Sequence, residues 1–174
     1  DAAGNAEARS TYYPSGQRAS LEDANGNTTF YLYDAFGRLE QTVYEDGSFE
    51  QPSYDAAGQV VAFQNRAGEM LSTSFDALGR RVGQEVPGTG SFVYAYDLAG
   101  RLVDATGPTG TTHHEYDSVG RLVQVDHATG HSVAYSYDAA GNRTQIVAPS
   151  GRGVLYGYDA MGRMTSAVDS GFAS

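Results

Sequence analysis

The chain has 174 residues with 22 Gly and 13 Tyr, and because Gly disfavours helices while Tyr favours strands, this composition predicts a β protein with many turns. The formal net charge is −10 and all eleven basic residues are Arg, spread along the chain among more numerous carboxylates, which disfavours nucleic acid and an anionic membrane surface as partners. Cys is absent, which excludes disulfides and Cys-ligated zinc. No stretch approaches the roughly 18 apolar residues of a membrane span.

The first residues carry worn copies of a motif that recurs downstream. Asp1-Ala2-Ala3-Gly4-Asn5 matches Asp138-Ala139-Ala140-Gly141-Asn142, and Tyr13-Pro14-Ser15-Gly16-Gln17 lies 20 residues before Tyr33. We therefore expect a degenerate repeat over 13–32. The opening residues lack the basic and apolar regions of a signal peptide, so we expect any export signal to lie outside this segment.

Seven further copies follow in register, spaced by 21, 21, 21, 20, 21 and 21 residues. Regular self-similarity of this kind is the signature of a repeat architecture. We therefore predict that 1–174 is a single repeat array, cut within a repeat at both ends. The predicted repeats are 33–53, 54–74, 75–95, 96–115, 116–136, 137–157 and the partial 158–174.

Each copy carries an aromatic residue, an Asp and, three residues after the Asp, a Gly. Arg follows the Gly in five copies, and Gln59 and Asn142 take its place in the other two. We predict that these motif residues are structural turn residues. They are Tyr33, Asp34, Gly37, Tyr54, Asp55, Gly58, Phe75, Asp76, Gly79, Tyr96, Asp97, Gly100, Tyr116, Asp117, Gly120, Tyr137, Asp138, Gly141, Tyr158, Asp159 and Gly162.

The chemistry of Asp-x-x-Gly explains the recurrence. Asp is favoured at the first position of a type I turn, where its carboxylate caps a backbone N–H, and a Gly at the fourth position can take φ > 0 and form a bulge. A second turn lies midway between motifs at 23–26, 107–110 and 148–151. Two turns per repeat predict two strands per repeat, each of about six residues.

Alternation in the strand before each Asp places Tyr residues, such as Tyr94 and Tyr96, on one face. The array could stack on carbohydrate, but recurrence in every repeat favours cross-strand pairs that stabilise a sheet. A ribbon of this kind is a single layer and does not bury both faces by itself.

The sequence offers three chemical alternatives to a structural role. A calcium ladder on the motif aspartates is disfavoured, because each Asp already has a capping role and most have an Arg nearby. The histidines His113, His114, His127 and His131, with Asp126 and Glu115 as neighbours, could hold a metal, but ordinary turn histidines are the simpler interpretation. No Ser lies in a nucleophile-elbow setting, so we predict no catalytic residue, no metal and no cofactor.

The strings at 96–102 and 116–122, Tyr-Asp-x-x-Gly-Arg-Leu, resemble the RHS (rearrangement hotspot) or YD-repeat family. The resemblance covers roughly 12–168 and includes bacterial RHS toxins, shell subunits of insecticidal toxin complexes and teneurins. It implies an all-β fold, a curved antiparallel ribbon of tandem β-hairpins that forms a solenoid-like shell segment. The closing segment of the family's shell and a toxin domain are both missing from these residues.

The resemblance implies a non-catalytic wall segment of a secreted bacterial shell that encloses a C-terminal toxin used in interbacterial competition. The expected partners are flanking repeats, copies of the same chain and the enclosed toxin. The alternative is an extracellular adhesive module at the cell surface that binds carbohydrate or assembles into filaments. Neither interpretation includes nucleic acid or a membrane span.

Overall fold

A computed structural model describes residues 8–171, and these residues are all-β, with sixteen strands and no helix. The motif at Asp1–Asn5 lies outside them, as do 172–174. No helix in the described part has the length and apolar character to cross a membrane. The chain divides into two compact units, residues 1–91 and 92–174.

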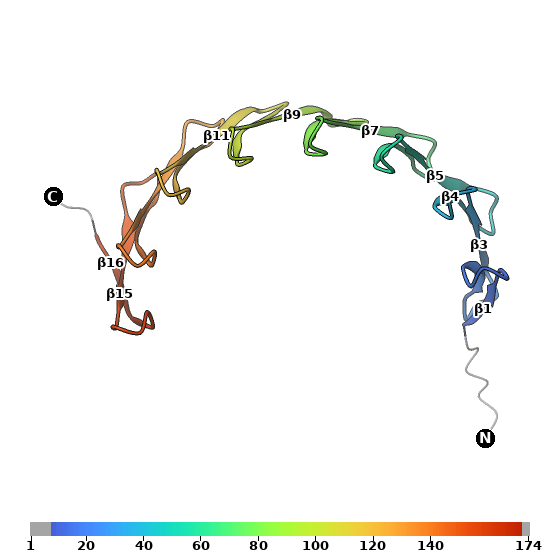
Figure 1. Cartoon of the computed structure of the whole chain (residues 1–174), viewed down its shortest axis with the longest axis horizontal. Helices are drawn as coiled ribbons and strands as arrows, with labels where there is room; N and C mark the ends of the chain where they lie inside the picture. The colour runs from blue at the N-terminus through green and yellow to red at the C-terminus, as the bar shows by residue number, and fades with distance from the viewer. Residues whose placement is uncertain (1–7, 172–174) are drawn as a thin grey trace, which may run out of the picture. The chain divides into compact units, whose positions relative to one another are not determined.

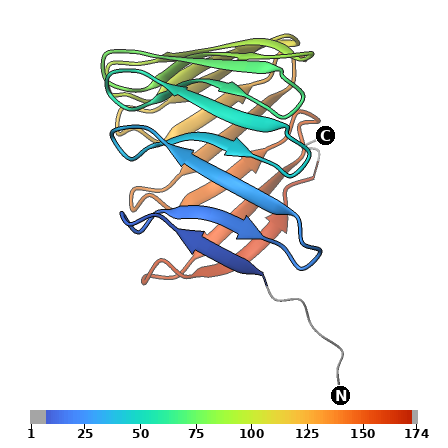
Figure 2. The same ribbon diagram turned by 90° about the vertical axis from the view of Figure 1, so that its right-hand side faces the viewer.

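The first unit is a single antiparallel layer in which each strand pairs with the strands next to it in sequence (Figure 2). Its eight strands are β1 (Arg9–Tyr12), β2 (Arg18–Glu22), β3 (Thr28–Tyr33), β4 (Leu39–Val43), β5 (Phe49–Tyr54), β6 (Val60–Gln64), β7 (Met70–Phe75) and β8 (Arg81–Val86). The turns therefore lie at two opposite edges of the layer. Figure 1 shows that the layer bends along the unit.

The second unit is built in the same way, again with strand order equal to sequence order. Its strands are β9 (Gly90–Tyr96), which starts at the division, β10 (Leu102–Gly107), β11 (Gly110–Tyr116), β12 (Leu122–Asp126), β13 (Ser132–Tyr137), β14 (Arg143–Val147), β15 (Gly153–Tyr158) and β16 (Met164–Asp169). It too is a curved layer in Figure 1. The prediction of a curved antiparallel ribbon of hairpins is confirmed within each unit.

The Tyr-Asp turns share one pattern of backbone hydrogen bonds. In the turn after β3, the Asp34 N–H donates to the Arg38 carbonyl and the Gly37 N–H donates to the Asp34 carbonyl, each at 2.9 Å. A bulge falls between Leu32 and Tyr33 just before the turn. The seven motif glycines have φ between 74° and 90°, which confirms that a left-handed residue ends each turn.

The turns at the opposite edge, which we call the mid-repeat edge, are less uniform. Most repeat the same hydrogen bonds, as at Asp23, whose N–H donates to the Asn27 carbonyl at 2.9 Å. Two differ: Pro108 and Thr109 form a two-residue loop between β10 and β11, and the turn at Pro87 is closed by Thr89 donating to Val86. The sequence had indicated three of these mid-repeat turns.

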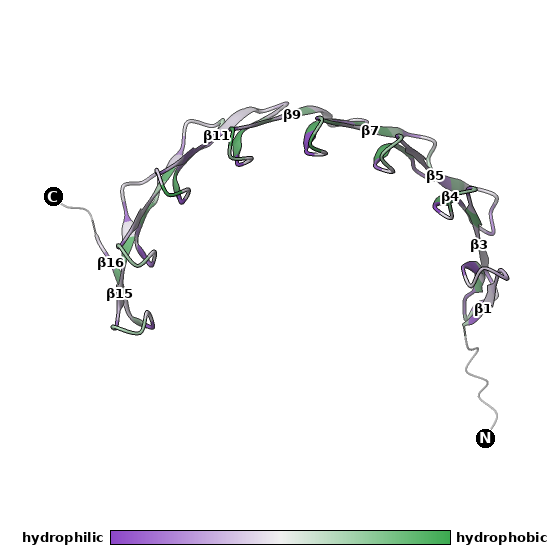
Figure 3. Ribbon diagram, viewed as in Figure 1, coloured by the Kyte–Doolittle hydropathy of each residue, from purple (hydrophilic) through white to green (hydrophobic). Residues whose placement is uncertain are grey.

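The layer has almost no enclosed core. Among the described residues only the side chains of Val125 and Thr42 are nearly buried, at 8% and 7% exposure. The strand before each motif Asp alternates, with Phe92, Tyr94 and Tyr96 half-buried on one face of β9. Figure 3 shows hydrophobic residues along the strands and hydrophilic residues at many turns. Stability must come mainly from neighbouring strands, as in other repeat proteins.

The structure corrects the alignment of the first, worn copy. The Tyr13 N–H donates to the Gln17 carbonyl and the Gly16 N–H to the Tyr13 carbonyl, which are the bonds made by Asp34 in the next turn. Tyr13 therefore stands where later copies have Asp, and Tyr12 at the end of β1 is the equivalent of Tyr33. The alignment of the sequence placed this copy out of register by one residue, because it matched Tyr13 to Tyr33.

Candidate functional site: the Tyr-Asp turns

The predicted motif residues occupy equivalent places in all seven copies. The aromatic residue ends a strand (β3, β5, β7, β9, β11, β13 or β15), the Asp opens the turn and the Gly is its fourth residue. The copies lie one after another along one edge of each unit, so no two motifs converge on a common cleft. This arrangement is a repeated linkage rather than a single site.

Each motif Asp caps its own turn with one carboxylate oxygen. Asp117 Oδ1 accepts the N–H of Val119 at 3.1 Å and the N–H of Arg121 at 2.9 Å. Asp97 makes the same two bonds, at 2.9 Å each, to Ala99 and Arg101. The turn therefore uses the oxygen to satisfy two backbone donors that would otherwise face solvent.

The second carboxylate oxygen of five motif aspartates binds the Arg that follows the Gly. Arg121 Nε lies 2.6 Å from Asp117 Oδ2, and both side chains are only 33% and 21% exposed. The pairs are Arg38–Asp34, Arg80–Asp76, Arg101–Asp97, Arg121–Asp117 and Arg163–Asp159. These ion pairs neutralise most of the edge in a chain that is otherwise strongly acidic.

Hydrogen bonds favour the ionised form of the motif carboxylates of Asp117 and Asp159. The backbone N–H of Arg121, opposed in part by lost hydration and aided by the Arg121 side chain, lowers the pKa of Asp117 below its ordinary value of 3.8. The backbone N–H of Arg163 and then its side chain lower the pKa of Asp159 in the same way. Lowered carboxyl pKa values fit turn capping and not general acid catalysis, which needs a raised one.

The Arg of one repeat also contacts the Tyr of the next. The guanidinium carbon of Arg121 lies 4.9 Å from the centre of the Tyr137 ring, and Arg101 and Arg38 lie 4.6 and 4.4 Å from the Tyr116 and Tyr54 rings. These distances are typical of cation–π contacts. The Arg therefore links its own turn to the neighbouring hairpin.

The Tyr hydroxyl completes this linkage. Tyr137 Oη donates to the Leu122 carbonyl at 2.9 Å. Tyr54, Tyr116 and Tyr158 donate in the same way to the carbonyls of Leu39, Leu102 and Arg143. These acceptors directly follow Arg38, Arg101 and Asn142. Leu122 directly follows Arg121, so ring and hydroxyl grip the same short segment. We call the motif Asp, its Arg and the next repeat's Tyr the Asp-Arg-Tyr clamp.

The copies without Arg use amides instead. Gln59 Nε2 donates to the Gly79 carbonyl of the next turn at 3.1 Å, and Gln17 makes the same bond to Gly37 at 2.8 Å. Asn142 is shorter and turns back to Asp138 Oδ2 at 2.9 Å. Gln therefore keeps a link between repeats, whereas the Asn142 amide bonds within its own turn.

Sequence reasoning found the Asp cap and the neutralising Arg but not the contact between repeats. The signal was present in the spacing, since the next Tyr follows each of Arg38, Arg101 and Arg121 by 15 or 16 residues. It was missed because the tyrosines were assigned to sheet packing or to sugar binding, where the hydroxyl has no specified partner.

The histidines do not gather. His113 Nδ1 lies 2.6 Å from Asp104 Oδ1 across β10 and β11, and this hydrogen bond raises the pKa of His113. His131 Nδ1 bonds the Thr129 hydroxyl at 2.8 Å. Within residues 8–171, no group of three or more His, Asp or Glu side chains is placed to hold a metal ion.

Comparison with known proteins gives one family and a consistent fold. The family model described as Teneurin YD-shell matches residues 15–141 and, in a second alignment, 52–169. Double-stranded DNA deaminase toxin A of Burkholderia cenocepacia strain H111 is 29% identical over 108 residues, which is 50% of this chain and 8% of that protein.

Among solved structures, a crystal structure of TcdB2-TccC3 without its hypervariable C-terminal region aligns with a TM-score of 0.72 and 18% identity, over 94% of this chain and 10% of that one. The Photorhabdus luminescens Tc holotoxin pore carrying a TccC3 mutation aligns with the same score, identity and coverage. The chain thus spans about a tenth of the length of these proteins, and the likeness establishes the fold.

Proposed function

Since the chain belongs to the Teneurin YD-shell family, we propose that it is a non-catalytic wall segment of a secreted RHS-type shell that encloses a C-terminal toxin. The observation that carries the proposal is the Asp-Arg-Tyr clamp. It uses the most regular polar side chains of the chain to join one hairpin to the next, as at Asp117, Arg121 and Tyr137. A wall gains from a linkage that recurs along the repeats, whereas an active site needs one exceptional repeat.

The comparisons support the same interpretation. One relative is named as a toxin, and one aligned structure is named as a Tc holotoxin pore. The enclosed partner on this proposal is a toxin polypeptide of the same reading frame, and the location is outside the cytoplasm of the producing cell.

The test is protection of that polypeptide. The natural reading frame that contains this segment is expressed whole and treated with a non-specific protease, and the fragments are identified by mass spectrometry. The proposal predicts a C-terminal fragment that resists digestion until the repeats are unfolded by urea. A C-terminal region that is digested as fast with folded repeats as with unfolded ones would overturn it.

An extracellular adhesive or filament-forming module is the second candidate, and exposed apolar side chains on a strand, such as Phe30 at 49%, favour it. On that alternative the chain binds immobilised glycans or forms ordered filaments. Glycan-array binding that is lost on substitution of Phe30, with no protected fragment in the digestion, would favour the adhesive function.

A further inference from the structure

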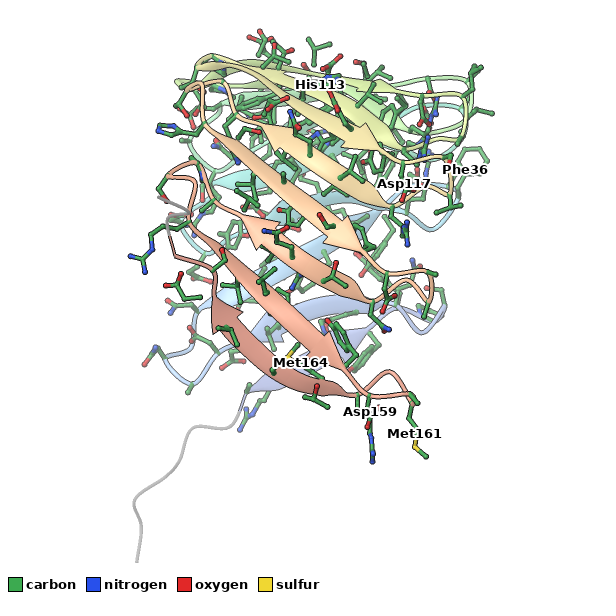
Figure 4. All side chains as sticks on the ribbon, turned by 90° about the vertical axis from the view of Figure 1, so that its left-hand side faces the viewer. Phe36, His113, Asp117, Asp159, Met161 and Met164 are labelled. Carbon is green, nitrogen blue, oxygen red and sulfur yellow. The ribbon has the colours of Figure 1, made fainter. Side chains whose placement is uncertain are left out.

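Large apolar side chains project from the tips of the Tyr-Asp turns. The central residues of these turns include Phe36, Leu78, Leu98, Val119 and Met161, all at least 72% exposed. Figure 4 shows Met161 at the tip of its turn, pointing away from the sheet, with Asp159 at the base. Side chains this exposed bury little surface, so they add little to the stability of their own hairpin.

These apolar tips occur in the five turns that contain an Asp–Arg ion pair. The two motif turns without Arg, at Asp55 and Asp138, have only Ala at both central positions. An apolar tip and a neutralised carboxylate therefore go together along this edge. In one turn they also touch, since the Arg38 guanidinium lies 5.1 Å from the Phe36 ring.

The pairing has a physical reason if the tips are contact points. Bringing an apolar surface against a partner removes water from the charges beside it, and an unpaired carboxylate resists this while an ion-paired one resists it less. Asp55 and Asp138 lack an Arg partner, and their turns carry no apolar tip. The mid-repeat edge lacks such tips: within residues 8–171, none of its turns presents a large exposed apolar side chain, although Asp46 there forms an ion pair with Arg66.

We propose that the Tyr-Asp edge of each unit is an interaction surface that docks edge to edge on the same edge of a second copy of this chain. Neighbouring tips are one or two repeats apart, and each repeat of two strands spans about 10 Å along the edge. A second copy presents the same apolar points with the same pitch, and in a two-fold dimer of the second unit Leu98 of each copy then faces Met161 of the other. The ion pairs leave five of the seven motif turns of this edge without net charge, which lowers the local repulsion between two chains of net charge −10.

The surface is one side chain wide, so docking on it buries less than the roughly 1,000 Å² that is typical of a stable interface. Edge docking of two free chains is therefore weak and depends on concentration. Added salt screens the repulsion between two chains of net charge −10 and therefore strengthens the association. The proposal does not depend on whether a toxin is enclosed.

Sedimentation velocity of the 174-residue chain over a concentration series tests the proposal. The edge variant carries Leu98→Ser, Val119→Ser and Met161→Ser, which change only exposed turn tips. The matched control carries Val93→Thr, Leu155→Thr and Val168→Thr, which remove apolar side chains that are 46–57% exposed on strands of the same unit. Circular dichroism and urea midpoints confirm that both variants remain folded.

We expect the association constant of the edge variant to fall at least tenfold while the control stays within twofold of the parent. A gain-of-contact variant, Ala57→Leu with Gln59→Arg, adds a neutral apolar tip to the first unit and is expected to strengthen association. A parent chain that is monomeric up to about 1 mM, or an edge variant that associates like the parent, would overturn the proposal. Loss in the control alone would assign association to the sheet face and overturn it equally.

Discussion

The two edges of the ribbon are built from the same kind of turn but differ in how regularly their side chains link neighbouring turns. On the Tyr-Asp edge, the side chains of Asp117 and Arg121 cap the turn and extend to Tyr137 in the next hairpin. On the mid-repeat edge the turn sequences vary from Asp-Ala-Asn-Gly to Gly-Pro-Thr-Gly, and the turn still forms. Side-chain links on the mid-repeat edge are irregular: Arg66 reaches Asp46 and the Tyr44 ring of the preceding turn, and Arg152 reaches Asp169. A hairpin therefore needs only turn geometry, whereas the Asp-Arg-Tyr clamp adds a side-chain link that recurs between hairpins.

The largest effects are expected at the glycines, because both edges depend on φ > 0. Gly120→Val and Gly141→Val place a β-branched residue at φ of 90° and 89°, and each should lower the free energy of unfolding by about 1–3 kcal/mol. An added Cβ at Gly120 would also meet Arg101 Nη1 at 3.2 Å, whereas Gly141 has open space. The loss at Gly120 should therefore be the larger in urea unfolding followed by circular dichroism. Equal losses would show that the clamp adds nothing at this turn.

Removing a motif carboxylate should come next and should separate the two kinds of Tyr-Asp turn. Asp117→Ala removes the cap and the partner of Arg121, whereas Asp138→Ala removes the cap and an amide hydrogen bond to Asn142. We expect a greater drop in urea midpoint for Asp117→Ala, and 0.5 M NaCl should narrow the gap, because salt screens an ion pair at a surface. A midpoint drop for Asp138→Ala that matches or exceeds it would contradict the account.

Acid should weaken the ribbon through the same carboxylates. The backbone N–H of Arg121 and the Arg121 side chain lower the pKa of Asp117, so its contribution to stability is present above its ordinary value of 3.8 and is lost as the pH falls below it. Urea midpoints at pH 7 and pH 3 measure the loss. The urea midpoint of Asp117→Asn should fall less between these pH values than that of the parent. An equal fall would show that other groups account for the loss of stability in acid.

The sequence allowed the turns to be predicted because turn chemistry is local. Asp at the first position and Gly at the fourth need nothing beyond four consecutive residues, and the bulge and φ > 0 follow from them. The Arg121–Tyr137 contact could not be predicted in this way, because it depends on how far the sheet offsets one hairpin from the next. The same limit explains the alignment error at Tyr13, where residue type suggested one register and backbone hydrogen bonds fix another.

A smaller effect is expected from the Tyr hydroxyl alone. Tyr137→Phe removes the donor to the Leu122 carbonyl and keeps the ring under Arg121, so the free energy of unfolding should fall by about 0.5–1.5 kcal/mol. Tyr135→Phe, on the same strand two residues earlier, serves as the comparison because Tyr135 has no role in the clamp. Urea titration of both variants distinguishes them, and equal losses would remove the hydroxyl from the account.

A double-mutant cycle between Arg121 and Tyr137 tests most directly that neighbouring repeats are joined through the clamp. Arg121→Met keeps much of the aliphatic stem but removes the charge, and Tyr137→Leu removes the ring and the hydroxyl. Free energies of unfolding are measured for the parent, both single variants and the double variant. We expect the loss in the double variant to fall short of the sum of the single losses by about 0.5–1 kcal/mol, the size of an exposed cation–π contact. Additive losses would show that the two residues stabilise their own hairpins independently and would contradict the account.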